Sequence, residues 1–88
     1  MESHGTIYAT LGESGEVVLL AIFDGAVTPE GIQAITGLPQ KLISSRLRAL
    51  VNLELAAKDP NGYVLTNSGQ ELAVIIADRR KAGETLRR

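Results

Sequence analysis

Apolar residues recur at helical spacing in the middle of the chain, where Ile43, Leu47 and Leu50 stand at i, i+4 and i+7. This spacing is typical of a helix that lies on a hydrophobic core, and it predicts a helix over about residues 40–53. On a wheel of about 100° per residue, the side opposite this stripe carries only residues that can donate hydrogen bonds. These residues are Lys41, Ser45, Arg48 and Asn52.

A shorter helix is predicted directly before it, beginning at Thr28-Pro29-Glu30. Threonine suits the N-cap, proline the first helical position and glutamate the first turn. Ile32 and Ile35 are predicted to face inward, and Gly37 is expected to end the helix. Two helices separated by a tight turn at residues 36–39, the second with a donor-rich outer face, are typical of a helix-turn-helix DNA reader.

The N-terminal third contains seven consecutive apolar residues, Val17–Phe23. They are predicted to lie in a helix over Gly15–Asp24, with Ser14 as N-cap and Gly25 after the C-terminus. Such a run covers the whole circumference of a helix, so more than one side must be buried. The N-terminal segment, a C-terminal helix or a second subunit could cover the second side. Residues 6–11 fit either a short strand or the first turns of a helix.

The pattern changes after Leu53. Residues 55–66 are predicted to form a β-hairpin around Asp59-Pro60-Asn61-Gly62, because these four residues suit a type I turn closed by a glycine. A last helix is predicted over Asn67–Ala82, capped by Thr66 or Ser68.

Length, composition and charge narrow the class of protein. The 88 residues suffice for one domain, residues 1–88, whose ends at 1–12 and 83–88 are expected to be flexible. The absence of cysteine excludes a disulfide framework and fits a cytoplasmic protein. No apolar run is long enough to span a membrane. The net charge is −1, which is unusual for a nucleic-acid binder, but three basic residues lie between Lys41 and Arg48.

Catalysis has little support in the sequence. The one histidine, His4, lies in a terminal tail, and no nucleophile elbow, phosphate-binding glycine loop or metalloprotease motif is present. No enzymatic activity, cofactor or metal ion is therefore expected.

The order of these elements resembles the winged helix-turn-helix family. The resemblance covers Ser14 to about Ala82, and it rests on Thr36-Gly37-Leu38, on the apolar stripe that follows, and on Tyr63-Val64-Leu65-Thr66 followed by Gly69. The last group is similar to the exit from the wing in MarR-like and ArsR-like prokaryotic regulators. The resemblance implies an α+β fold, mainly helical, with a three-helix core, a small hairpin and a C-terminal helix. It departs from the family at Glu54, where glycine is usual, and at the wing tip, which has no Arg or Lys.

This resemblance implies a cytoplasmic transcriptional regulator that binds double-stranded DNA with the helix at about residues 40–53 in the major groove. The candidate DNA contacts are Gln40, Lys41, Ser44, Ser45, Arg48, Asn52, Lys58 and Asn61. Taken alone, this polar face also fits an ordinary solvated surface. The apolar excess on the first and last helices predicts a homodimer through Val18, Ile22, Ala73, Val74 and Ala77. The alternative is a winged helix that serves as a protein–protein interaction module in a larger assembly.

Overall fold

The computed structural model describes residues 3–86 and the side chains of residues 11–82. Its elements are α1 (Ser3–Phe23), α2 (Pro29–Thr36), α3 (Gln40–Asn52), β1 (Ala56–Asp59), β2 (Gly62–Leu65) and α4 (Asn67–Leu86). β1 and β2 form an antiparallel two-stranded sheet. The predicted α+β class, mainly helical with a small hairpin, is confirmed. The side chain of His4 and most of the ends predicted to be flexible lie outside the described side chains.

α1 is longer than predicted and is kinked at Gly12, whose φ of 65° and ψ of −179° are not helical. Residues 6–11 are therefore helical and not a strand. The prediction that Ser14 caps the helix is wrong, because helical geometry resumes directly after Gly12 and the Ser14 hydroxyl accepts a hydrogen bond from Arg46. The predicted stop is confirmed: Gly25 has a φ of 109°, and the Ala26 N–H donates to the Ala21 carbonyl at 2.9 Å.

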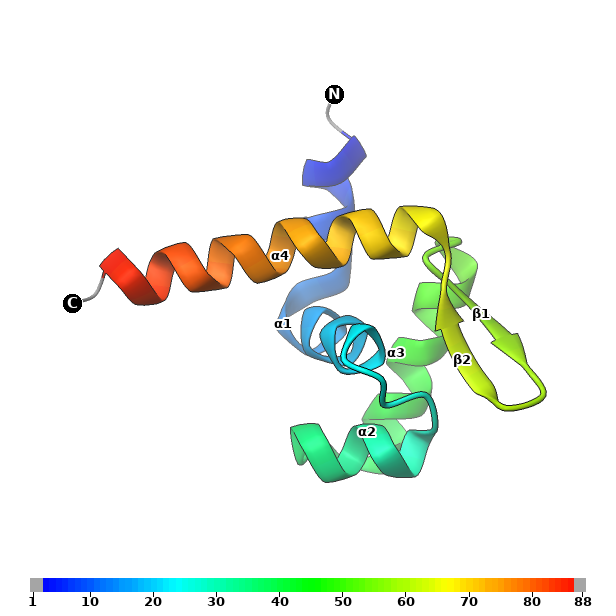
Figure 1. The fold of residues 1–88 in the computed structure, drawn as a ribbon. Helices are drawn as coiled ribbons and strands as arrows, with labels where there is room; N and C mark the ends of the chain where they lie inside the picture. The colour runs from blue at the N-terminus through cyan, green and yellow to red at the C-terminus, as the bar shows by residue number, and fades with distance from the viewer. Residues whose placement is uncertain (1–2, 87–88) are drawn as a thin grey trace.

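α1 lies in the middle of the molecule, between α4 on one side and α2 on the other (Figure 1). It contacts α2, α3, α4 and β2, which explains how a helix with an apolar run on all sides can be covered. The sequence left three candidates to bury the second side of α1, and the structure shows that the C-terminal helix, α4, is one that does so. Leu19, Ile32, Leu50 and Leu72 are each 0% exposed and form the centre of this core.

The burial of α1 and α4 corrects the predicted dimer interface. Val18 and Ala73 are 0% exposed and Ile22 is 5% exposed, all within the core of this chain. These three side chains cannot contact a second copy without opening the core. Of the predicted set, Val74 is exposed and Ala77 half-buried. The homodimer remains a prediction. Of the predicted interface residues, Val74 and Ala77 are the two that a second copy could contact.

The turn between α2 and α3 is held by local hydrogen bonds. The Thr28 hydroxyl accepts from the Gly31 N–H at 3.0 Å, which confirms the predicted N-cap. Gly37 has a φ of 74° and its N–H donates to the Gln33 carbonyl, as expected for a C-cap. Ile32 is buried, but the prediction that Ile35 faces inward is wrong, since its side chain is 60% exposed. Leu38 packs against the core after the turn instead.

The hairpin is attached to the helices at both ends. The Tyr63 N–H donates to the Val27 carbonyl at 2.8 Å, which ties β2 to the link between α1 and α2. At the exit, the Thr66 hydroxyl accepts from the Gly69 N–H at 3.1 Å and donates to the Glu54 carbonyl at 2.7 Å. Thr66, rather than Ser68, therefore caps α4. Among the described residues, no helix is both long and apolar enough to cross a membrane.

Candidate nucleic-acid interface

α3 presents one face to the core and the opposite face to solvent. Ile43 and Leu50 are 0% exposed and Leu47 is 1% exposed, which confirms the predicted stripe. The predicted contacts on the other side are all exposed: Lys41, Ser44, Ser45, Arg48 and Asn52. α3 contains three basic residues and no Asp or Glu, so no carboxylate of this helix opposes an anion at this face.

Gln40 is half-buried in the turn and does not stand free on the outer face. Its amide nitrogen donates to the Pro29 carbonyl and to the Gln33 amide oxygen, both at 3.0 Å. Both amide hydrogens therefore fasten the start of α3 to α2. The predicted base contact by Gln40 remains a prediction, and it would require these hydrogen bonds to be broken or shared.

Arg46 lies on the flank of α3 that faces α1. Its Nε donates to the Ser14 hydroxyl at 2.7 Å, and a terminal nitrogen lies 3.4 Å from the Ser45 hydroxyl. Arg46 therefore joins α3 to α1. The other two basic residues of α3, Lys41 and Arg48, are the cations of its outer face.

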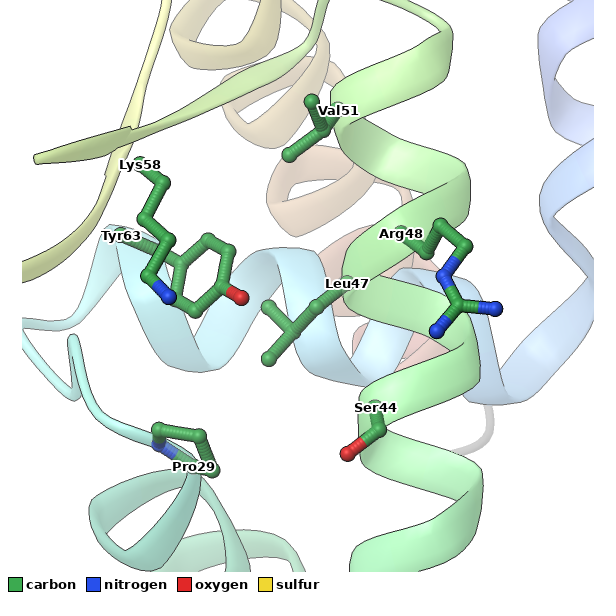
Figure 2. A pocket seen from close by; sticks show the side chains of 7 residues that line it. All are labelled: Pro29, Ser44, Leu47, Arg48, Val51, Lys58 and Tyr63. Atoms are coloured by element: carbon green, nitrogen blue, oxygen red, sulfur yellow. The ribbon is translucent and has the colours of Figure 1, made fainter.

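A hollow of about 360 Å³ lies between α3, the hairpin and the start of α2 (Figure 2). Its lining consists of Ser44, Leu47, Arg48 and Val51 from α3, Lys58 and Tyr63 from the hairpin, and Pro29. Lys58 and Tyr63 are cross-strand partners, and the ammonium lies 5.8 Å from the ring centroid, within cation–π range. In Figure 2 the hydroxyls of Ser44 and Tyr63 point into the space between α3 and the hairpin. The lining contains no carboxylate; Lys58 borders the hollow from the hairpin, whereas the guanidinium of Arg48 points away from Lys58 and Tyr63 (Figure 2).

The structure brings together three of the eight predicted DNA contacts, namely Ser44, Arg48 and Lys58. Asn61 lies in the turn of the hairpin, where its backbone N–H donates to the Asp59 carboxylate at 2.9 Å, and it does not line the hollow. Lys41, Ser45 and Asn52 point more directly away from the core, at about 160–200° from Ile43 on the helical wheel.

Sequence reasoning missed Val51 and Tyr63 as members of the site. Both carried a usable signal. Val51 falls at about 80° on the same wheel, beside Ser44 at about 100°. Tyr63 follows from the register of a hairpin closed by Asp59 and Gly62, which pairs it with Lys58.

A second hollow, of about 320 Å³, lies on the other side of Tyr63, between the end of α1, β2 and the start of α4. It is mainly apolar and is lined by Ile22, Phe23, Val27, Tyr63, Val64, Leu65 and Gln70. Phe23 is 42% exposed and Val64 41% exposed, which is high for large apolar side chains that lie near each other. No group of three or more His, Cys, Asp or Glu residues that could hold a metal ion occurs in the described part of the chain.

Helix, helix-turn-helix, hairpin and closing helix together define an α+β winged-helix fold. A scan against protein-family models finds no match, and no curated protein is significantly similar in sequence. Solved structures are similar. The O-methyltransferase NcsB1 from neocarzinostatin biosynthesis, determined in complex with S-adenosyl-L-homocysteine, matches with a TM-score of 0.57 and 29% identity. The match covers 67% of this chain and 20% of that one, so this chain spans about a fifth of the methyltransferase.

A second structure matches over nearly its full length. The activation domain of the phage T4 transcription factor MotA has a TM-score of 0.68 and 19% identity, covering 97% of this chain and 93% of that chain. At this identity the likeness shows the fold alone. The fold is therefore one that occurs in a transcription factor and within a larger enzyme.

Proposed function

We propose that this chain binds double-stranded DNA as a transcriptional regulator of the MarR-like or ArsR-like prokaryotic kind, with α3 in the major groove. The observation that carries the proposal is the outer face of α3, which is exposed along its length and has basic and hydroxyl side chains without a carboxylate. The major groove of B-DNA is wide enough to admit an α-helix.

Roles follow from where each side chain lies. Lys41 and Ser45 point most directly outward from the core and would approach base edges. Lys58 lies on the hairpin beside the hollow, and Arg48 extends from α3 with its guanidinium directed away from the hairpin (Figure 2). Both would contact phosphates. The Ser44 hydroxyl lies near both and can donate a hydrogen bond to a phosphate or to a base edge. A net charge of −1 implies that such binding depends on this local cluster and is sensitive to salt.

The test is a titration with random-sequence duplex DNA at low and moderate salt. Lys41→Ala and Arg48→Glu should weaken binding, and the slope of log K against log salt should fall by about one unit for each phosphate that a variant no longer binds. Lys81→Ala and Lys81→Glu are the matched controls. They make the same charge changes on exposed α4, whose C-terminal end points away from the hairpin (Figure 1). Equal weakening by the Lys81 variants would contradict the assignment to α3.

A second candidate is a protein–protein interaction module. It is favoured by the apolar hollow at which Phe23 and Val64 are exposed, and by the lack of net positive charge. The fold match to the activation domain of a transcription factor is compatible with this role. Absence of any salt-sensitive DNA binding, even at low salt, would favour this candidate over the first.

A further inference from the structure

We propose that Asn61, in the turn of the hairpin, is a site of spontaneous deamidation, in which its side-chain amide is converted to a carboxylate. The chain has three asparagines, and Asn61 is the one that a glycine follows. In this reaction the main-chain nitrogen of the next residue attacks the side-chain amide. A following glycine favours the attack, because it has no Cβ atom to obstruct the approach and its main chain is the most adaptable.

The side chain of Asn61 is exposed and unrestrained. Its main-chain N–H donates to the Asp59 carboxylate at 2.9 Å, but its side-chain amide makes no hydrogen bond within the described part of the chain. Asp59 and Gly62 form the last pair of the hairpin, and the turn between them lies at the edge of the molecule (Figure 1). Such a tip opens locally more often than a helix does, so the amide can reach the Gly62 nitrogen.

The other two asparagines are held in helices. Asn52 is the last residue of α3 and Asn67 the first residue of α4, and both side chains are also exposed. Ring closure needs a main-chain ψ far from the helical value of about −42°, so the helices hold these asparagines in an unreactive conformation. Leu53 and Ser68, which follow them, also have Cβ atoms. We therefore expect Asn61 to react at least about tenfold faster than either.

The reaction releases ammonia and consumes water. The nitrogen of Gly62 forms a bond to the side-chain carbonyl carbon of Asn61, and the bond from this carbon to the amide nitrogen breaks. The amide leaves as ammonia with the proton of the Gly62 N–H, and a cyclic imide remains. Water then opens the ring at one of its two carbonyls, which gives either aspartate or isoaspartate. In isoaspartate the main chain runs through the former side chain and is one methylene longer.

The two products differ in their effect on the fold. The extra methylene of isoaspartate lies directly before Gly62, where the hairpin packs closely on the link between α1 and α2. A Cβ atom at Gly62 would overlap the Val27 carbonyl oxygen, and the Tyr63 N–H donates to the same oxygen at 2.8 Å. Isoaspartate should therefore displace this hydrogen bond, whereas aspartate leaves the main chain unchanged.

Either product changes the charge of the hairpin, and the consequence for DNA rests on the proposed function. One neutral amide becomes a carboxylate, so the net charge of the chain falls from −1 to −2. The new carboxylate lies near Asp59 and near Lys58, the hairpin cation assigned above to a DNA phosphate. Repulsion from the phosphates should lower DNA affinity about two- to fivefold at low salt, and less at high salt.

The site is tested without DNA, by incubating the whole chain in mildly alkaline buffer and following its tryptic peptides by mass spectrometry. Cleavage after Lys58 and Arg79 gives a peptide, residues 59–79, that contains both Asn61 and Asn67. Fragment ions therefore compare the two within one molecule. Asn61 should convert first, and methylation by a protein isoaspartyl methyltransferase should identify the isoaspartate.

The same chain unfolded in urea is the positive control. The proposal is overturned if Asn52 or Asn67 deamidates as fast as Asn61 in the folded chain. It is also overturned if Asn61 of the folded chain stays an amide for as long as the unfolded chain needs to convert fully.

Variants separate the reaction from its effect on DNA. Asn61→Gln, whose longer side chain disfavours ring closure, should keep its own DNA affinity constant during the incubation, whereas the parent loses affinity. Asn61→Asp supplies one product directly and should bind DNA more weakly than Asn67→Asp, which adds the same charge at the exposed start of α4. In thermal melts the isoaspartate form should unfold at a lower temperature than Asn61→Asp.

The outcomes distinguish this inference from the proposed function. If fresh protein binds DNA but Asn61 does not convert, the inference fails while the proposed function stands. If Asn61 converts but fresh protein does not bind DNA, the proposed function fails and the modification site stands. If the converted chain and fresh protein bind DNA equally, the effect on DNA is refuted.

Discussion

Replacement of Glu54 by glycine should stabilise the protein. α3 ends at Asn52, and the chain leaves it through a Schellman motif, in which the Leu55 N–H donates to the Leu50 carbonyl at 2.9 Å and the Glu54 N–H to the Val51 carbonyl at 3.0 Å. This motif places Glu54 in the left-handed region, with a φ of 62°, the one described non-glycine residue at positive φ. The position is exposed, and within the described residues the glutamate side chain makes no hydrogen bond or ion pair to compensate.

The magnitude follows from two opposing terms. A residue with a Cβ atom loses about 1–2 kcal/mol in the left-handed conformation, and glycine removes this cost. Glycine also raises the conformational entropy of the unfolded chain, and this reduces the gain in stability by about 0.5–1 kcal/mol. The two terms bracket the net gain for Glu54→Gly at about 0–1.5 kcal/mol, and their midpoints give about 0.5–1 kcal/mol. For a domain of this length, that gain corresponds to a rise in Tm of about 2–8 °C.

The assay is thermal and urea denaturation followed by circular dichroism at fixed protein concentration. Glu54→Ala is the control, because it removes the carboxylate and keeps the Cβ atom, and its stability should lie within about 0.5 kcal/mol of the parent. The reasoning is refuted if Glu54→Gly is no more stable than Glu54→Ala, since the strain would then not reside in the backbone at this position.

Two further changes test the exit from the hairpin. Thr66→Val should lower the free energy of unfolding by about 1–2 kcal/mol, because it removes the N-cap of α4 and the hydrogen bond to the Glu54 carbonyl, whereas Thr66→Ser should retain both. Gly69→Ala should cost about 2–3 kcal/mol by urea denaturation, because a Cβ atom there would overlap the Leu55 carbonyl oxygen. Ser68→Ala, at the exposed neighbouring position, should have little effect and serves as its control. A Gly69→Ala variant as stable as Ser68→Ala would contradict the close packing of α4 on Leu55.

The local elements of this fold could be predicted because their signals lie within a few residues of one another. Thr28 and Pro29 begin α2, Gly37 ends it, and the capping hydrogen bonds at both ends join residues three or four positions apart. The turn of the hairpin is similarly local, with the Asp59 side chain accepting from the Asn61 N–H. Such bonds need only the few residues that form them, so the local sequence indicates them at these positions. At Ser14 the same kind of signal failed, because α1 continues on its N-terminal side.

Burial could not be predicted as well, because it depends on where distant helices lie. Val18 and Ile35 both fit an inward-facing helical position. Val18 is covered because α4 and α3 pack on α1, whereas Ile35 sits in the last turn of a short helix and is exposed. The next apolar residue, Leu38, packs on the core after the turn. Periodicity gives the face of a helix but not how far along the helix the core extends.

The same limit applies to the candidate site. The helical wheel identifies Ser44 and Arg48 as neighbours, but the hollow also requires Lys58 and Tyr63, which reach it only because the hairpin folds back beside α3. Tyr63 is held there by its backbone bond to Val27, and this contact spans more than thirty residues of sequence. The position of each side chain on its own helix or hairpin was therefore visible in the sequence, whereas the approach of the hairpin to α3, which creates the hollow, follows from tertiary structure.

Glu54 shows how tertiary contacts can impose a conformation that the sequence does not signal. Glycine is the residue favoured by the geometry after α3, and its absence would suggest a different exit. The next residue, Leu55, is 2% exposed, and its carbonyl accepts from the Thr66 N–H at 3.0 Å. The Glu54 carbonyl accepts from the Thr66 hydroxyl. Because these contacts on both sides fix the backbone, residue 54 adopts the left-handed conformation although it has a Cβ atom, and the strain remains in the folded state.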